Sequence, residues 1–282
     1  MDGRGDYMQD GRPEHSGQLE SENVISSFYW KKGAQSNQGS RKEQQDDYGM
    51  VLGTYKGKQT LLAVLADGMG GMKNGAQFSW ITVEYLMKHF QEALDTGLPP
   101  FSILLSLAYG ANNEAYKIYD EEKPGGTTLI AGMFVEDRFY MLSVGDSRIY
   151  LFRKHKTEKK YVPLQLNREH VLGPSLDERA WMGKISFEDA KDNMYRDSLI
   201  SGIGSEKIRR IDLTLNPIRL LTGDKVVFMS DGIYRSLSEE EMAKDLELTP
   251  DKASDELVRH VLEKKMPHQD NMSVIVVERI SS

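Results

Sequence analysis

Four aspartates stand at positions that suit the binding of a hard metal ion, namely Asp46, Asp67, Asp231 and Asp270. Asp67 and Asp231 each follow an apolar run and precede a glycine, so each is expected to cap a buried strand, where a carboxylate is fixed by the sheet yet open to solvent. A fifth candidate is Asp146, which follows another apolar run and a glycine. Carboxylate oxygens are preferred ligands of Mg²⁺ and Mn²⁺, so several of these side chains together would form an all-oxygen site. This pattern predicts metal-assisted hydrolysis.

The composition excludes several other kinds of chemistry. The chain has no cysteine, which rules out a cysteine nucleophile, a thiolate metal site and a disulfide framework. Its six histidines are scattered and show none of the spacings of a zinc site. The net charge of −7 argues against sequence-independent binding to nucleic acid, which needs a surplus of basic residues on one face. A carboxylate site for hard cations is compatible with all three observations.

Two local motifs add detail, but neither decides the function by itself. The glycines after Asp67 let the backbone turn closely around a ligand, and the Gly68 carbonyl could point toward a metal ion. A tight strand-to-helix turn with a capping aspartate explains the same motif equally well. Arg41 precedes Asp46 in a polar loop, where its guanidinium could bind a phosphate through two hydrogen bonds. A surface arginine paired with Glu43 is the simpler interpretation of Arg41 alone.

The hydrophobic pattern predicts the strands and helices that would position these side chains. Apolar residues at helical spacing predict two helices within 78–116, and a second pair is expected over 238–246 and 250–264. The first helix of the second pair begins with a capping box formed by Ser238 and Glu241. A polar loop is expected over 33–39. The expected strands are 48–55, 59–66, 127–135, 138–144, 148–153, 225–229 and 272–278.

Hairpin-linked strands interrupted by helix pairs indicate an antiparallel α/β architecture rather than the regular alternation of a Rossmann sheet. Residues 167–212 lack long apolar runs and contain short helical pieces at 177–182 and 186–191, so we expect an excursion over the core. Residues 1–22 are polar and are expected to form a disordered tail. The sequence shows no apolar run long enough to span a membrane and no signal pattern, so a cytoplasmic location without membrane attachment is expected.

The motifs are far more specific together than any one of them alone. They occupy residues 39–46, 65–71, 125–128, 144–148, 229–232 and 269–273. In this order and setting the sequence resembles the metal-dependent protein phosphatases, the PPM or type 2C serine/threonine family, and in particular its bacterial members. The resemblance implies an α+β fold, an α-β-β-α sandwich of two antiparallel sheets flanked by helix pairs. It further implies a single phosphatase domain over 23–282, with a flap segment at about 167–212.

The resemblance also assigns roles to the acidic residues. Asp67 would bridge two Mn²⁺ or Mg²⁺ ions. The Gly68 carbonyl would bind one of these ions, and Asp231 and Asp270 would bind the other. Asp46 would ligate directly or hold metal-bound waters.

Two further residues complete the site that the resemblance implies. Asp146 would help to bind a third, weaker metal ion, and Arg41 would bind the substrate phosphate. A hydroxide bridging the two principal ions would attack phosphorus in line, without a covalent intermediate. The residues expected to take part in catalysis are Arg41, Asp46, Asp67, Asp231 and Asp270.

The expected substrates are phosphoserine and phosphothreonine residues of proteins, and a partner serine/threonine kinase is expected by family analogy. The chain is expected to act as a monomer. Two alternatives stay open. A catalytically silent family member could use the same sandwich as a binding or signalling module, and a two-metal nuclease or phosphodiesterase could use a similar carboxylate cluster. The acidic charge balance and the absence of a basic stripe count against the second alternative.

Overall fold

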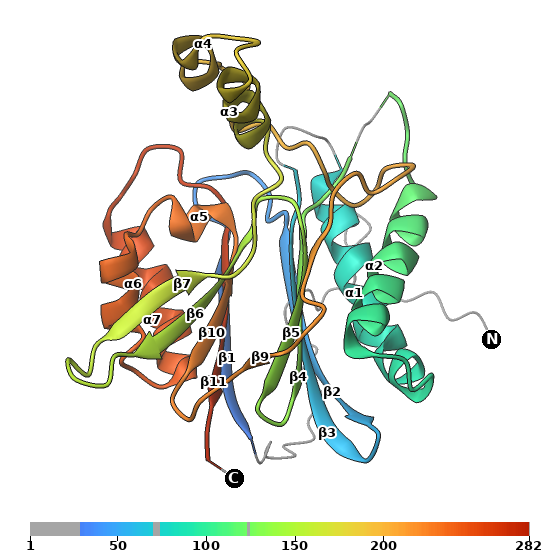
Figure 1. Ribbon diagram of the computed structural model, residues 1–282, viewed down its shortest axis with the longest axis vertical. Helices are drawn as coiled ribbons and strands as arrows, with labels where there is room; N and C mark the ends of the chain where they lie inside the picture. Colours follow the sequence, from blue (N-terminus) through green and yellow to red (C-terminus); the bar gives the residue numbers. More distant parts are fainter. Residues whose placement is uncertain (1–28, 70–73, 123–124, 282) are drawn as a thin grey trace.

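Two antiparallel β-sheets lie face to face, and helices cover the outer face of each sheet (Figure 1). The computed structural model describes residues 29–69, 74–122 and 125–281. In spatial order, the five-stranded sheet contains β1 (Trp30–Asn37), β11 (Met272–Arg279), β10 (Lys225–Met229), β6 (Arg148–Lys154) and β7 (Tyr161–Gln165). The six-stranded sheet contains β2 (Asp46–Tyr55), β3 (Lys58–Asp67), β4 (Leu129–Val135), β5 (Arg138–Val144) and β8 (Asp212–Leu213), with β9 (Ile218–Arg219) also paired to β5.

The helices form two outer layers and one projection. The pair α1 (Gly75–Asp95) and α2 (Pro100–Tyr116) covers the six-stranded sheet, and the pair α6 (Glu239–Asp245) and α7 (Pro250–Glu263) covers the five-stranded sheet (Figure 1). A short helix, α5 (Asp231–Tyr234), follows β10 directly. The remaining helices of the described residues are α3 (Gly173–Trp181) and α4 (Phe187–Lys191). The α-β-β-α sandwich predicted from the sequence is therefore confirmed.

Aromatic side chains fill the space between the sheets. Phe134 of β4, Phe139 of β5 and Phe228 of β10 meet there, with ring centroids 4.7–6.3 Å apart. Because neighbouring side chains on a strand point to opposite faces, Leu129 and Met133 of β4 pack against the helix layer instead. Every residue of β4 is buried for this reason. The strand ends that carry the candidate site are thus held by a core on each face of the sheet.

The sequence prediction of a polar loop at 33–39 is wrong for residues 33–37. Strand β1 continues to Asn37 and pairs with β11 along its whole length, from Trp30 opposite Arg279 to Asn37 opposite Met272. An added Cβ at Gly33 would lie 2.4 Å from the Pro250 backbone, so α7 approaches the strand closely at this point. The polar side chains are tolerated because β1 is an edge strand whose outer positions stay partly exposed. Strand β7, which pairs with β6, is absent from the sequence prediction.

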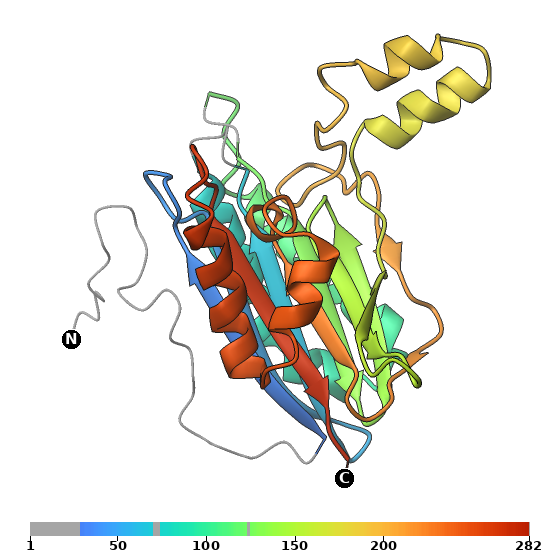
Figure 2. The same ribbon diagram turned by 90° about the vertical axis from the view of Figure 1, so that its left-hand side faces the viewer.

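Helices α3 and α4 project beyond the sandwich and pack on each other (Figures 1 and 2). Their shared core is small and contains Leu176, Ala180 and Ala190. The short helical pieces expected within 167–212 correspond to these two helices, although α3 begins earlier, at Gly173. The assignment of 23–282 to one domain with a flap remains a prediction, and the tail predicted at 1–22 lies outside the described residues.

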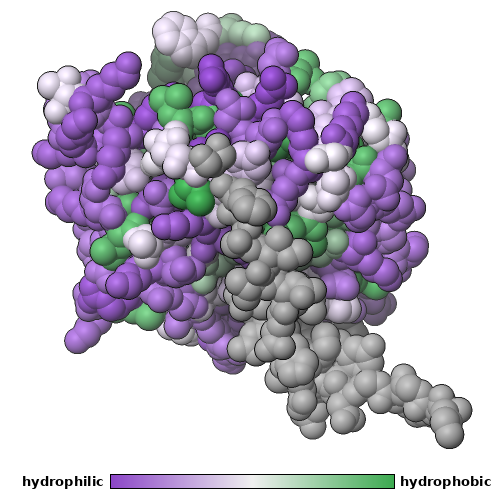
Figure 3. All heavy atoms as spheres, turned by 90° about the horizontal axis from the view of Figure 1, so that it is seen from below, coloured by the Kyte–Doolittle hydropathy of each residue, from purple (hydrophilic) through white to green (hydrophobic). Residues whose placement is uncertain are grey.

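The surface shown in Figure 3 is mostly hydrophilic, with apolar residues scattered between polar ones. Scattered apolar residues of this kind are normal on a folded protein. Within the described parts of the chain, none of the helices combines the length and the apolar character needed to cross a lipid bilayer.

Candidate metal centre

The β2–β3 hairpin brings the first two aspartates together. Asp46 begins β2 and Asp67 ends β3, and the two residues are direct partners in the antiparallel register. Their carboxylates therefore lie at the same end of the sheet. Thr128, the residue before β4, holds this end in place, because the Asp67 N–H donates to the Thr128 hydroxyl at 2.9 Å and the Thr128 N–H donates to the Asp67 carbonyl at 2.9 Å.

The third aspartate arrives from the other sheet. Asp231 is the first residue of α5, so it begins a short helix as soon as β10 has ended. The preceding residue, Ser230, donates its hydroxyl hydrogen to Asp46 Oδ2 at 2.8 Å and accepts the Ser273 N–H at 2.9 Å. Ser230 thereby ties the two sheets together at the point where their aspartates meet.

The fourth aspartate lies in the loop before β11, which is clamped to the loop containing Arg41. Asn271 donates to the carbonyls of Gln38 and Glu43 at 2.8 and 3.0 Å. Gly39 has φ +63°, and a Cβ there would lie 2.3 Å from the Asp270 carbonyl oxygen, so this close approach requires glycine. Arg41 Nη2 lies 2.5 Å from Asp270 Oδ2. Arg41 therefore pairs with a predicted metal ligand, not with Glu43.

Asp146 lies in the turn between β5 and β6, directly after Gly145. Its side chain is largely buried, and Arg235 Nη2 lies 3.7 Å from its carboxylate. The Tyr234 hydroxyl donates to the Asp146 carbonyl oxygen at 3.2 Å. His170 fixes the turn from the other side, because its N–H donates to the Gly145 carbonyl at 2.8 Å and its Nδ1 accepts the Gly145 N–H at 3.1 Å.

The aspartates are close enough to raise one another's pKa values. Burial is the main cause for Asp46, whose pKa rises to about 7 against the lowering effect of the Ser230 hydrogen bond. Burial also raises the pKa of Asp67 well above its usual range, and the charges of Asp46, Asp231, Asp146 and Asp270 add to the rise. For Asp146, burial followed by the charge of Asp231 raises the pKa to about 6. The structure thus brings together all five aspartates that the sequence singled out.

Two arginines partly balance this negative charge. Arg41 pairs with Asp270, and Arg235 Nε lies 3.1 Å from Asp231 Oδ2. Across residues 29–69, 74–122 and 125–281, no group of three or more acidic, histidine or cysteine side chains is arranged to hold a metal ion as it stands. Asp231 and Asp270 form ion pairs with Arg235 and Arg41 instead, which agrees with the absence of such a group.

The donor set nevertheless fits a hard divalent cation. Asp46 Oδ1 is buried and has no hydrogen-bond partner among the described residues, which is an expensive state for a carboxylate oxygen. All the candidate donors are oxygens, as Mn²⁺ and Mg²⁺ prefer. Gly68 lies beside them, where a Cβ would be 2.5 Å from the Gly75 carbonyl oxygen, so the backbone at Gly68 is closely surrounded.

Comparison with known proteins identifies the family. A family model described as protein phosphatase 2C matches residues 35–269, which is most of the chain. The chain belongs to the protein phosphatase 2C family. The predicted enzyme class, a protein serine/threonine phosphatase, is therefore confirmed at the level of the family.

Relatives of this type 2C chain come from several bacteria. It is 29% identical to the serine/threonine phosphatase stp of Listeria monocytogenes over 224 residues, which cover 77% of this chain and 84% of that protein. A solved S. agalactiae serine/threonine phosphatase has 26% identity and a TM-score of 0.71, covering 90% of this chain and 100% of that one. The catalytic domain of PstP, solved with two manganese ions, has the same fold, with 23% identity, a TM-score of 0.69, and coverage of 90% of this chain and 100% of that one.

Several residues of this type 2C site were not found by sequence reasoning. Ser230 and Asn271 each adjoin a predicted ligand, so their positions in the motifs could have pointed to a supporting role. Arg235 stands four residues after Asp231, and this helical spacing is a usable signal for an ion pair once α5 is expected. His170 carries no comparable local signal, because it reaches Gly145 from a distant part of the chain.

Proposed function

We propose that this chain hydrolyses phosphoserine and phosphothreonine monoesters in proteins with the help of two Mn²⁺ or Mg²⁺ ions. The observation that carries the proposal is the convergence of five aspartates around the buried, unpartnered Asp46 Oδ1. Membership of the type 2C family supports the reaction class. The two manganese ions in the PstP catalytic domain support the choice of metal.

In this proposal the ligands divide as the family resemblance implies. Asp67 would hold both ions, the Gly68 carbonyl would hold one, and Asp231 and Asp270 would hold the other. Asp46 would complete the site directly or through water. Bound there, two divalent ions would lower the pKa of a water molecule and neutralise phosphoryl oxygens.

Asp146 and Arg41 have separate roles in the proposal. Asp146 would help to hold a third, weaker ion, because it lies at the edge of the same cluster. Arg41 would bind the phosphate by turning from Asp270 toward the substrate. Its side chain is 46% exposed, so little packing opposes this movement. A planar guanidinium can donate two parallel hydrogen bonds to a phosphate, which would fix the ester for in-line attack.

The experiment is a metal-dependent assay with matched variants. The wild-type chain should hydrolyse p-nitrophenyl phosphate with Mn²⁺, and Asp67→Asn or Asp231→Asn should lose nearly all of this activity. Asp95→Asn is the control, because Asp95 is exposed at the far end of α1 from Gly75. Full Mn²⁺-dependent activity in both site variants would falsify the proposal.

Two further assays separate the alternatives. A silent binding module would bind Mn²⁺ in calorimetry without hydrolysing p-nitrophenyl phosphate. A phosphodiesterase would prefer bis-p-nitrophenyl phosphate, whereas the proposed enzyme should prefer the monoester by a wide margin.

The proposal extends to the cellular setting. The substrates would be cytoplasmic phosphoproteins, opposed by a serine/threonine kinase, and the chain would act as a monomer. Light scattering on the purified protein checks the oligomeric state. Phosphoproteomics of cells with and without the gene should show phosphoserine and phosphothreonine sites that increase in its absence.

A further inference from the structure

A cavity of about 890 Å³, which we call the groove, lies where the two chain segments that connect α3 and α4 to the sandwich leave it. These two segments are the arms of the α3–α4 projection. One arm contributes residues within 165–174, and the other contributes residues within 196–212. Three exposed arginines line it, namely Arg168, Arg209 and Arg210. The cavity is open to solvent, so its lining is accessible to a polypeptide.

The guanidinium groups of these arginines are not neutralised. Among the described residues, Arg168 and Arg209 have no ion-pair partner, and Arg210 Nη2 donates only to the neutral Ser175 hydroxyl at 3.2 Å. Arg196 in the same lining differs, because its two terminal nitrogens donate to the Asp177 carboxylate at 2.8 and 2.6 Å. Arg196 is therefore satisfied within the fold, whereas the other three are available to a ligand.

The acidic residues of the lining do not cancel this charge. Arg148 already engages Glu169, with Nε 2.7 Å from the carboxylate. The remaining acids, Asp197 and Asp212, are outnumbered by Arg168, Arg209 and Arg210, which leaves an excess of one positive charge. The whole chain carries −7, so this groove is a positive site on a strongly negative protein. Such a site attracts anions and favours those that can approach several guanidinium groups at once.

The groove adjoins the turn that carries Asp146. His170, which lines it, exchanges two hydrogen bonds with Gly145, the residue before Asp146. The same histidine accepts the Ile200 N–H through its carbonyl at 2.9 Å, which joins the two arms of the projection. A polypeptide with its phosphorylated residue at the aspartates would reach the groove by running past the turn that carries Asp146.

We propose that this groove binds an acidic group of the substrate polypeptide, a carboxylate or a second phosphate, a few residues from the phosphorylated residue. The proposal rests on the proposed phosphatase function and specifies its substrate class. The three arginines act as specificity determinants because they bind the polypeptide away from the reacting phosphate. Selectivity then follows from charge on the flanking sequence.

The test compares phosphothreonine peptides that differ only in their flanks. One peptide has alanine flanks, two carry three glutamates before or after the phosphothreonine, and one carries a second phosphothreonine. Wild-type kcat/KM should be about tenfold higher for an acidic peptide than for the alanine peptide, on the scale of two or three exposed ion pairs. The preference should shrink at high ionic strength, because salt screens exposed charges. Comparison of the glutamate peptides with the doubly phosphorylated peptide shows which acidic group the groove prefers.

The decisive variant is Arg209→Glu/Arg210→Glu, in which the ratio of acidic to neutral kcat/KM should fall to about one or below. Arg179→Glu is the matched control, because Arg179 is exposed on α3 but does not line the cavity. The ratio should survive in the control. The proposal would be overturned if the wild type showed no preference for acidic peptides. It would also be overturned if the preference survived in the double variant, or if Arg179→Glu lost it to the same extent.

Two readouts keep the groove separate from the reaction. Hydrolysis of p-nitrophenyl phosphate and a thermal melt report whether each variant has an intact centre and fold, and Arg209→Ala/Arg210→Ala replaces the double variant if it unfolds. If the wild type fails to hydrolyse p-nitrophenyl phosphate with Mn²⁺, the phosphatase proposal fails. Fluorescence anisotropy of the acidic peptide then still tests the groove, and equal binding by wild type and double variant would refute it.

Discussion

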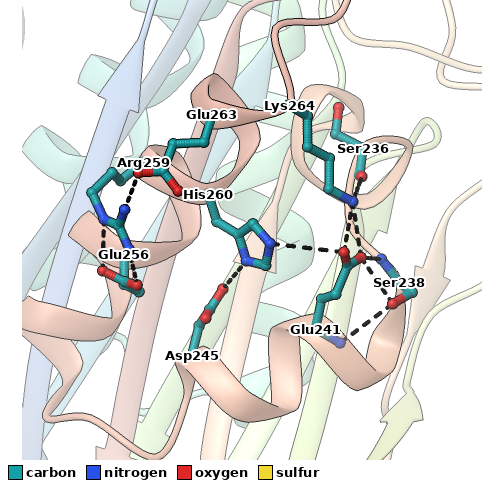
Figure 4. Close-up of polar contacts among 9 residues, drawn as sticks. All are labelled: Ser236, Ser238, Glu241, Asp245, Glu256, Arg259, His260, Glu263 and Lys264. Atoms are coloured by element: carbon teal, nitrogen blue, oxygen red, sulfur yellow. Dashed lines mark hydrogen bonds and ion pairs between the residues drawn. The ribbon is translucent and has the colours of Figure 1, made fainter.

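The metal centre and the polar network between α6 and α7 differ in how far their acidic side chains are paired with basic ones. In the network each acid has a basic partner within 4 Å, as Figure 4 shows. The pairs are Glu241 with Lys264, Asp245 with His260, and Glu256 and Glu263 with Arg259. In the metal centre five aspartates meet two arginines, and no basic side chain of the described residues forms an ion pair with Asp46 or Asp67.

The pKa values of Glu241 in the network and of Asp46 in the metal centre move in opposite directions, although burial raises the pKa of Asp245 in the network as well. Hydrogen bonds from Lys264 and then from Ser238 lower the pKa of Glu241 to about 2. Burial raises the pKa of Asp46 to about 7. Charge therefore supports the fold between α6 and α7, whereas at the sheet ends the fold holds a concentration of negative charge that bound cations would relieve. This difference leads us to expect that substitutions in the network change stability and that substitutions at the aspartates change activity.

The largest expected effect is that of Asp46→Asn, which should separate activity from stability. Loss of this carboxylate should lower Mn²⁺-dependent turnover of p-nitrophenyl phosphate by about 100-fold, the scale seen when a metal site is altered. The same change removes a buried charge beside other carboxylates, so the free energy of unfolding in EDTA should rise. Steady-state kinetics and urea unfolding measure the two effects. A variant that is less stable than wild type in EDTA would contradict the idea of excess charge.

The second prediction concerns pH in the absence of divalent ions. The pKa values of Asp46 and Asp146 in the folded protein are about 7 and about 6, above the unfolded value of 3.8. Between these values the folded protein binds more protons than the unfolded chain, so the free energy of unfolding must fall as pH rises. The loss should be on the order of a few kcal/mol between about pH 4 and pH 7.

Urea unfolding in EDTA across this pH range measures the effect. Asp46→Asn should flatten the profile, and added Mn²⁺ should restore stability near neutral pH because cations bind the ionised carboxylates. A free energy of unfolding that rises with pH from 4 to 7 in EDTA would show that the pKa values of Asp46 and Asp146 are not raised in the folded protein.

The third prediction tests the role of the Arg41 side chain at the metal centre. Arg41→Ala should lower kcat/KM for p-nitrophenyl phosphate by about tenfold to a hundredfold, because one positioned donor to the phosphate is lost. Arg41→Lys should give an intermediate value, since lysine keeps the charge but not the two-pronged geometry. Arg219→Ala is the control, because Arg219 pairs with Asp137 on an exposed surface. Equal kinetics for Arg41→Ala and wild type would remove Arg41 from the site.

The sequence could single out the aspartates that the structure brings together because their local setting is distinctive. An aspartate between an apolar run and a glycine is recognisable at Asp67 and Asp231 without knowledge of the fold. The helix cap at Ser238 was predictable for the same reason, and the capping box with Glu241 is present in the structure. Features that depend on a few consecutive residues could therefore be predicted from the sequence.

Features that depend on contacts between residues far apart in the sequence could not be predicted in this way. The strand conformation of residues 33–37 comes from pairing with β11, more than two hundred residues away, and no local pattern of these polar residues indicates it. The role of His170 depends on its contact with Gly145 across the fold. The arginines of the groove become a site only when the two arms of the α3–α4 projection come together.

The smallest expected effect belongs to the stability network, where Ser238→Ala should change the fold and not the reaction. Ser238 accepts the Glu241 N–H through its hydroxyl, and the Glu241 carboxylate accepts the Ser238 N–H at 2.7 Å. Removal of the hydroxyl should lower the free energy of unfolding by about 1 kcal/mol, the usual effect of losing an N-cap. Ser238→Thr keeps the hydroxyl and should remain near wild type.

Urea unfolding and Mn²⁺-dependent kinetics on the same samples complete this test. Activity per folded molecule should be unchanged in Ser238→Ala, because its hydrogen bonds serve α6 and do not reach the aspartates. The two regions would then respond in opposite senses: Asp46→Asn gains stability and loses activity, and Ser238→Ala loses stability and keeps activity. A drop in turnover with Ser238→Ala would mean that the network between α6 and α7 also positions the centre, and the separation of stability from function would fail.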